Sequence, residues 1–189
     1  MSKELSFAVS SSPHIRSDED TRSIMLDVII SLIPALAVAI YIFGLRSLTL
    51  TLVCVAACVF FEWGYRKLLK KPSSVGDLSA VVTGMLLTFC LPVTVPYWIP
   101  VIGAFFAIVI VKQLYGGIGK NFLNPALAAR AFLFSWPVIM TTWAAPLSYS
   151  RFANIFSVAD AITSATPMEA LHAGRLPDAT LWQAFIGEI

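Results

Sequence analysis

The sequence predicts an all-α integral membrane protein, and three observations lead to this fold class. Of the 189 residues, 58% are hydrophobic and only 13% are charged, whereas a soluble domain is nearer half apolar and a quarter charged. The apolar residues gather in segments, the first of which has the ~20 residues that cross a bilayer. The basic residues concentrate in one loop between such segments. A formal net charge of +2 gives no indication of nucleic acid as a partner.

Residues 1–21 form a polar lead-in without the features of a cleavable signal, and we expect it on the cytoplasmic side. The first predicted span, residues 24–44, follows it. Asp27 near the start of this span either snorkels to the interface or is an intramembrane carboxylate on an ion path. Pro34 predicts a kink in this helix.

The second predicted span covers residues 48–63. Glu62 and Arg66 near its end have the i, i+4 spacing of a helical ion pair. The loop that follows carries the densest positive cluster of the chain, which predicts the cytoplasmic side of the membrane: Arg66, Lys67, Lys70 and Lys71. Arg46 is then expected to lie in the first outer loop as an isolated basic residue.

The third apolar segment, residues 78–91, is shorter and predicts a short span or a re-entrant helix. Gly84 within it allows close packing against a neighbouring helix. Residues 92–96 carry no charge and are expected outside. Tyr97 and Trp98 then form an interfacial anchor at the start of the fourth predicted span, residues 97–111.

Basic residues bring the chain back to the positive side after this span. Residues 116–121 are rich in glycine but lack the spacing of a phosphate-binding loop and the strand before it, so they predict a tight turn. Asn124 and Pro125 form an N-cap followed by proline, which opens a fifth predicted span. Arg130 in this span either snorkels to the interface or pairs with an acid or with the anionic edge of a cofactor.

Counting about five crossings gives a transmembrane bundle over residues 22–140, a cytoplasmic N-terminus, and a segment 141–189 on the outer face. The three cysteines lie inside apolar segments and are not a disulfide framework. Cys54 and Cys58 share a helix face, a spacing compatible with a metal pair. Packing as small apolar residues is favoured because free cysteine is so readily buried, and we expect no metal site.

A short hydroxyl-rich stretch at residues 160–169 lies in the expected outer segment. Thr166, Pro167 and Glu169 form a capping box, with threonine as the N-cap and glutamate reaching back to it. The Thr166 hydroxyl would therefore lie beside unpaired N–H groups at the positive end of a helix, where a phosphate is well placed. An ordinary helix start explains the same residues.

Several segments resemble one family, that of the RnfD subunit of the Rnf electron-transport complex: residues 11–14, 22–25, 112–121 and 124–126. The stretch 160–166 resembles the flavinylation motif of that family. The NqrB subunit of the Na⁺-translocating NADH:quinone oxidoreductase shares the motif and is the alternative assignment. The short polar lead-in favours the Rnf subunit.

This resemblance implies a membrane flavoprotein in which FMN is attached through its phosphate to Thr166 by a separate transferase. Asp160, Thr163 and Ala165 match the motif, while Ser164 stands where several relatives have glycine. Riboflavin is a further cofactor that the family suggests. The implied partners are the lipid bilayer of the bacterial inner membrane and the other subunits of the Rnf complex, RnfA, RnfB, RnfC, RnfE and RnfG.

The resemblance also implies a subunit of an ion-translocating oxidoreductase, coupled to Na⁺ or H⁺ and not active alone. No catalytic side chain is expected, since the flavin does the chemistry. Family members are longer, so the chain is expected to correspond to their N-terminal portion. A transporter subunit without cofactor, or a scaffold that packs partner subunits, is the competing class of function, and short or proline-broken helices would suit a transporter.

Overall fold

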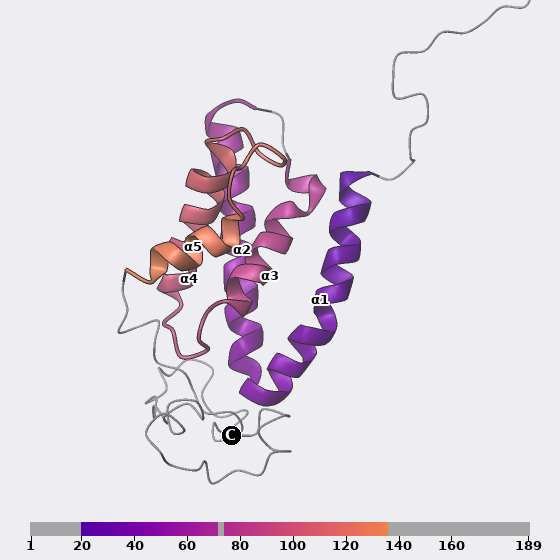
Figure 1. Cartoon of the computed structure of the whole chain (residues 1–189), viewed down its shortest axis with the longest axis vertical. Helices are drawn as coiled ribbons and strands as arrows, with labels where there is room; N and C mark the ends of the chain where they lie inside the picture. The colour runs from indigo at the N-terminus through magenta and orange to yellow at the C-terminus, as the bar shows by residue number, and fades with distance from the viewer. Residues whose placement is uncertain (1–19, 72–73, 136–189) are drawn as a thin grey trace, which may run out of the picture.

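The computed structural model describes residues 20–71 and 74–135, and these form a bundle of helices (Figure 1). The observed architecture therefore belongs to the predicted all-α class. In chain order the elements are α1 (Thr21–Phe43), α2 (Leu45–Leu68), the 3₁₀ turn η1 (Val75–Asp77), α3 (Ser79–Phe89), α4 (Trp98–Phe105), the π-helix η2 (Phe106–Gln113) and α5 (Pro125–Leu133).

The two long helices α1 and α2 are antiparallel neighbours. They have 23 and 24 residues, or roughly 35 Å each, and among the described helices these two are long and apolar enough to cross a membrane. Gly44 ends α1 and begins α2 with a φ of 77°, a conformation that glycine adopts without strain. This single residue makes the reversal between the two helices tight.

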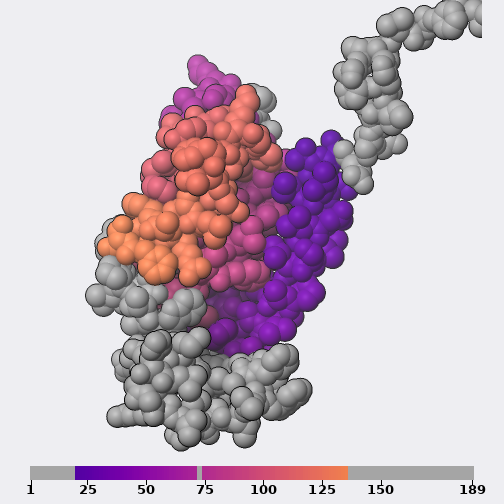
Figure 2. All heavy atoms as spheres, in the orientation of Figure 1, coloured from indigo at the N-terminus to yellow at the C-terminus, as the bar shows by residue number. Residues whose placement is uncertain are grey.

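Helix α1 lies along one side of the molecule, as Figure 2 shows. None of its residues is buried, and Asp27 is exposed. The helix is bent in Figure 1 and contains Pro34, in agreement with the predicted kink. Its exposed apolar side chains suit contact with lipid or with protein segments beyond the described residues.

The core lies where α3 and α4 pack against α2. Cys54 and Cys58 of α2 are completely buried in it, which agrees with the prediction that they are packing residues. Within the described residues no group of three or more His, Cys, Asp or Glu side chains is arranged to hold a metal ion. Gly84 of α3 is buried against α2, and a Cβ atom built on it would lie 2.8 Å from the Val55 Cα atom. The predicted role of Gly84 in close packing is confirmed.

We expect Gly84→Ala to lower the thermal midpoint of the protein in detergent, because the added methyl group would collide with the backbone of α2. Overpacking of this kind costs about 1–3 kcal/mol. Gly64→Ala is the matched control, since a Cβ on Gly64 of α2 meets nothing within 4 Å. The midpoints are measured by a scanning fluorescence melt. Equal midpoints for both variants would contradict the prediction and would show that α2 and α3 can move apart to accommodate the methyl group without loss of stability.

The fourth predicted span is continuous but is not one α-helix. Helix α4 passes directly into the π-helix η2, so the helical stretch runs from Trp98 to Gln113, two residues beyond the predicted end. The wider turn of the π-helix η2 is a local irregularity of the kind that often occurs at functional sites. Trp98 at the start of this stretch is 49% exposed.

The helix predicted as a fifth span begins where the sequence predicted, but it is shorter and runs in another direction than a span in the bundle would. Asn124 caps α5, since its side-chain oxygen accepts a hydrogen bond from the Ala126 N–H at 3.0 Å, and Pro125 is the first helical residue. The helix has nine residues, or roughly 14 Å, less than half of a hydrocarbon core. It crosses α2 and α3 rather than running parallel to them (Figure 1). The predicted count of five spans and the domain bounds at 140 and 141 depend on residues outside the described ranges.

The expected position of Arg46 in an outer loop is wrong. Arg46 lies in the first turn of α2, and only 2% of it is exposed. Its Nε atom donates to the Val93 carbonyl at 2.7 Å and an Nη atom donates to the Val95 carbonyl at 3.1 Å. The guanidinium also lies over the Tyr97 ring. Arg46 is buried because it satisfies the carbonyls of the loop between α3 and α4.

Candidate functional site

A buried charged cluster lies near the end of the bundle where α1 begins and α2 ends. Glu62 of α2 is fully buried, and Lys112 near the end of η2 is 3% exposed. The Lys112 Nζ atom lies 2.9 Å from one Glu62 carboxylate oxygen and 3.1 Å from the other. A buried charge is costly unless it is paired, so the two residues depend on each other. We name this ion pair, together with the neighbouring Gln113 that also contacts Glu62, the charged cluster.

The π-helix brings two consecutive residues to the same carboxylate. Gln113 follows Lys112 in the chain, and its Nε2 atom donates to Glu62 Oε1 at 2.8 Å. Both are among the last residues of η2, where hydrogen bonds span five residues instead of four and the turn is wider. The irregular helix therefore directs an ammonium group and an amide group onto Glu62 together.

Residues between α2 and α3 complete the hydrogen bonding. The Ser74 hydroxyl donates to Glu62 Oε1 at 2.6 Å. Lys112 Nζ donates to the Ser79 hydroxyl, which in turn donates to Asp77 Oδ1 at 2.6 Å. Among the described residues every buried side-chain nitrogen and oxygen has a hydrogen-bond partner. The charged cluster is thus connected to the loop on the basic side of the bundle.

The ion pair differs from the one that helical spacing suggests. The i, i+4 rule favours Glu62 with Arg66, whereas the 2.9 Å ion pair joins Glu62 to Lys112. Arg66 reaches the same cluster through its Nε atom, which donates to Gln113 Oε1 at 3.1 Å. The sequence did not identify Lys112 and Gln113, the two polar residues of η2, as site residues. The available signal was one acid near the end of one apolar segment and one lysine at the end of another, both expected on the same side of the membrane.

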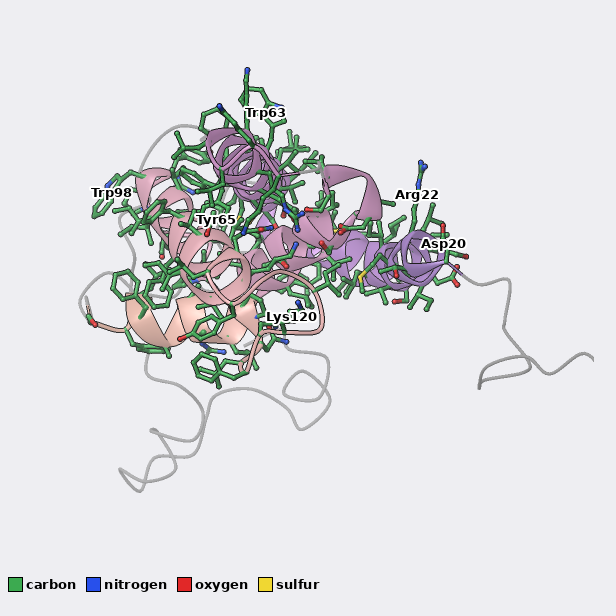
Figure 3. All side chains as sticks on the ribbon, turned by 90° about the horizontal axis from the view of Figure 1, so that it is seen from above. Asp20, Arg22, Trp63, Tyr65, Trp98 and Lys120 are labelled. Carbon is green, nitrogen blue, oxygen red and sulfur yellow. The ribbon has the colours of Figure 1, made fainter. Side chains whose placement is uncertain are left out.

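A pocket with a cavity volume of about 190 Å³ lies beside the charged cluster. It is lined by the start of α1, by helices α3 and η2, and by the segment leading into α5. The polar side chains in its lining offer ammonium, hydroxyl and amide groups: Lys112, Ser79, Thr83, Asn121 and Asn124. Figure 3 views this end of the bundle, with Asp20 and Arg22 at the start of α1 and Lys120 in the turn after η2. The lining can hydrogen-bond a polar ligand, and its other residues are apolar.

Only one of the site residues predicted from the sequence lies in the described ranges. Arg130 is a half-buried residue of α5, with its guanidinium carbon 5.5 Å from the centre of the Phe134 ring. It does not line the pocket beside Lys112. The five residues of the predicted attachment motif lie outside the described residues: Asp160, Thr163, Ser164, Ala165 and Thr166.

Fold and site together define an all-helical membrane protein that carries a buried ion pair between its helices. The model of the NQR2, RnfD, RnfE family matches residues 8–189. The chain therefore belongs to this family, as the resemblance predicted.

Individual relatives point to one branch of the family. The chain is 55% identical over 173 residues to the D subunit of the Na⁺-translocating ferredoxin:NAD⁺ oxidoreductase complex of Acetobacterium woodii, covering 91% of this chain and 51% of that protein. It is 42% identical over 166 residues to the D subunit of the proton-translocating complex of Clostridium ljungdahlii, covering 87% of this chain and 48% of that protein. The D subunit of the ion-translocating oxidoreductase complex of Vibrio cholerae is 38% identical over 208 residues, covering 95% of this chain and 60% of that protein. The chain spans about half the length of the first two relatives.

Proposed function

We propose that the chain is part of the RnfD membrane subunit of an Rnf-type complex, which transfers electrons between ferredoxin and NAD⁺ and couples this to Na⁺ or H⁺ translocation. The names of the relatives support this reaction. One relative is named as Na⁺-translocating and another as proton-translocating, so the names are compatible with either coupling ion. The observation that carries the flavoprotein role is the flavinylation-like stretch 160–166 in a chain of this family. In this proposal the subunit lies in the bacterial inner membrane and works with RnfA, RnfB, RnfC, RnfE and RnfG.

FMN would supply the redox chemistry, and the protein would attach and orient it. Thr166 would hold the flavin through a phosphoester at the start of a helix on the outer face. The phosphodiester keeps a negative charge, and the positive end of a helix stabilises such a charge by about 0.3–1 kcal/mol. Asp160, Thr163, Ser164 and Ala165 would shape the segment that the transferase recognises.

The charged cluster is the feature of the described residues that fits ion coupling. Ionisable side chains inside membrane segments are rare and often belong to ion or proton paths. Glu62 and Lys112 lie on separate helices, so a relative movement of α2 and η2 would change their distance and their charge balance. We assign the coupling role in this part of the subunit to this pair.

Riboflavin, the second cofactor suggested by the family, has a chemically suitable place in the pocket beside Lys112. Thr83, Asn121 and Asn124 offer hydroxyl and amide groups for the ring edge and for the ribityl chain. Apolar side chains such as Leu86 provide a surface for the flat ring. The volume of about 190 Å³ encloses part of such a molecule, and other segments would cover the remainder.

In-gel fluorescence tests the flavoprotein role against the competing classes. We expect the subunit, produced in a bacterium that has the flavin transferase, to give a fluorescent band under ultraviolet light after denaturing electrophoresis. Non-covalent riboflavin is lost on denaturation, so the signal reports the covalent flavin alone. A dark band would support a cofactor-free transporter or scaffold subunit, and it would contradict the NqrB assignment as well.

A further inference from the structure

The turn between η2 and α5 collects basic side chains from two separate segments. Gly116, Gly117 and Gly119 all have positive φ, at 110°, 97° and 80°. The Lys120 side chain lies against Gly116, where a Cβ would be 2.9 Å from its Cδ atom. An Arg66 Nη atom lies against Gly117, where a Cβ would be 3.1 Å away. We name residues 116–120 the glycine turn. Because Gly116 and Gly117 carry no side chains, a lysine and an arginine can approach these two adjacent residues.

Positive charge dominates the surface around the glycine turn. The last turn of α2 and the residues just after it add three exposed lysines, Lys67, Lys70 and Lys71. Lys67 lies over the Trp63 ring at 4.5 Å and Lys71 over the Tyr65 ring at 5.9 Å. The nearby acids are engaged inside the bundle, Glu62 with Lys112 and Asp77 with Ser79. Asp20 lies at the start of α1, away from Lys120, in Figure 3. This end of the bundle therefore attracts anions.

An apolar groove begins at the glycine turn and runs between η2 and α5. It has a cavity volume of about 460 Å³. Tyr115 and Phe122, whose ring centres are 4.8 Å apart, lie on either side of the turn and line the near end. Phe106 and Phe132 are stacked at 4.2 Å and line the far end. The groove follows η2 from Phe106 to Tyr115, and its volume accommodates part of an acyl chain.

We propose that the glycine turn and this groove form a binding site for an anionic phospholipid. The headgroup phosphate binds between Lys120 and Arg66, and one acyl chain lies in the groove between η2 and α5. Charge complementarity selects an anionic lipid, because basic pockets between membrane helices hold acidic headgroups through several cations. The contiguity of a basic turn with an apolar groove matches the two parts of a lipid. The site rests on membrane insertion and is independent of the covalent flavin.

Lipid retention measured by native mass spectrometry tests the headgroup contact. The whole subunit is reconstituted in nanodiscs of equal parts phosphatidylglycerol and phosphatidylcholine, extracted in detergent, and the bound lipids are counted. Wild-type protein is expected to retain phosphatidylglycerol in preference to phosphatidylcholine. Lys120→Gln should reduce this preference about fivefold, the change expected for one basic side chain beside an acidic headgroup. Lys70→Gln is the matched control, since Lys70 is an exposed lysine of the same end, and it should retain most of the preference.

A second pair of variants tests the acyl-chain groove. Ala128→Phe places a large side chain in the groove and should abolish retention of the lipid, whereas Leu127→Phe on the exposed face of α5 should not. Equal retention of both lipids by the wild-type protein would overturn the proposal, because the groove would then bind any acyl chain without the headgroup. Absence of retained lipid in the wild-type protein would also overturn it and would indicate that a protein segment fills the groove.

Discussion

Thr166→Ala is expected to remove covalent flavin and electron transfer together while the subunit still inserts and assembles. The substitution deletes the hydroxyl oxygen that forms the proposed phosphoester. We expect a small structural effect, because loss of the predicted N-cap would cost about 1 kcal/mol. Denaturing in-gel fluorescence measures the attached flavin, and immunoblotting of the membrane fraction measures the amount of inserted subunit.

The neighbouring hydroxyls provide the control for this experiment. Thr163→Ala should weaken attachment at most, because Thr163 belongs to the proposed motif but precedes the proposed acceptor by three residues. Mass spectrometry of the peptide 152–175 should place the FMN mass on Thr166. The same mass on Thr163 or Ser164 would refute the assignment of the residue and leave the function intact. A peptide without flavin in a strain that has the transferase would refute the flavoprotein role itself.

Lys112→Met is expected to destabilise the described bundle strongly. It leaves Glu62 buried without its counter-ion, a loss that costs about 3–5 kcal/mol. Detergent melts should show a lower thermal midpoint than for the wild-type protein. Lys70→Met removes an exposed lysine at the same end of the bundle and should change the midpoint little. Equal midpoints for the two variants would show that the ion pair contributes nothing to stability.

The double variant Glu62→Leu, Lys112→Met separates a structural role of the pair from a role in ion movement. Replacing a buried ion pair by apolar residues is often neutral for stability, so the midpoint should recover relative to Lys112→Met alone. Ion translocation by the assembled complex should nevertheless be lost in the double variant, because neither the carboxylate nor the ammonium group of the pair is left. Recovery of translocation together with stability would show that the pair serves only to hold α2 and η2 together.

The sequence by itself determined the features that depend on neighbouring residues. Long apolar segments predicted a membrane bundle, and α1 and α2, which are long and apolar enough to cross a membrane, agree with them. The dipeptide at 124–125 predicted the start of α5 because capping is a contact over two or three residues. The shortness of α3 was visible from the length of its apolar segment. The proposed flavin attachment at Thr166 likewise rests on local sequence and on family membership.

Only the tertiary structure decided which distant residues meet. Glu62 and Lys112 are fifty positions apart, and their pairing depends on the rotation of α2 and on the π geometry of η2. As a charged residue between two apolar segments, Arg46 was expected in a loop. It is instead buried, because it donates hydrogen bonds to carbonyls of a loop almost fifty positions away. Hydrophobic periodicity reports which face of a helix is apolar, and it contains no information on the register between helices. Register is set by close contacts such as Gly84 against Val55, and these exist only when the helices are packed.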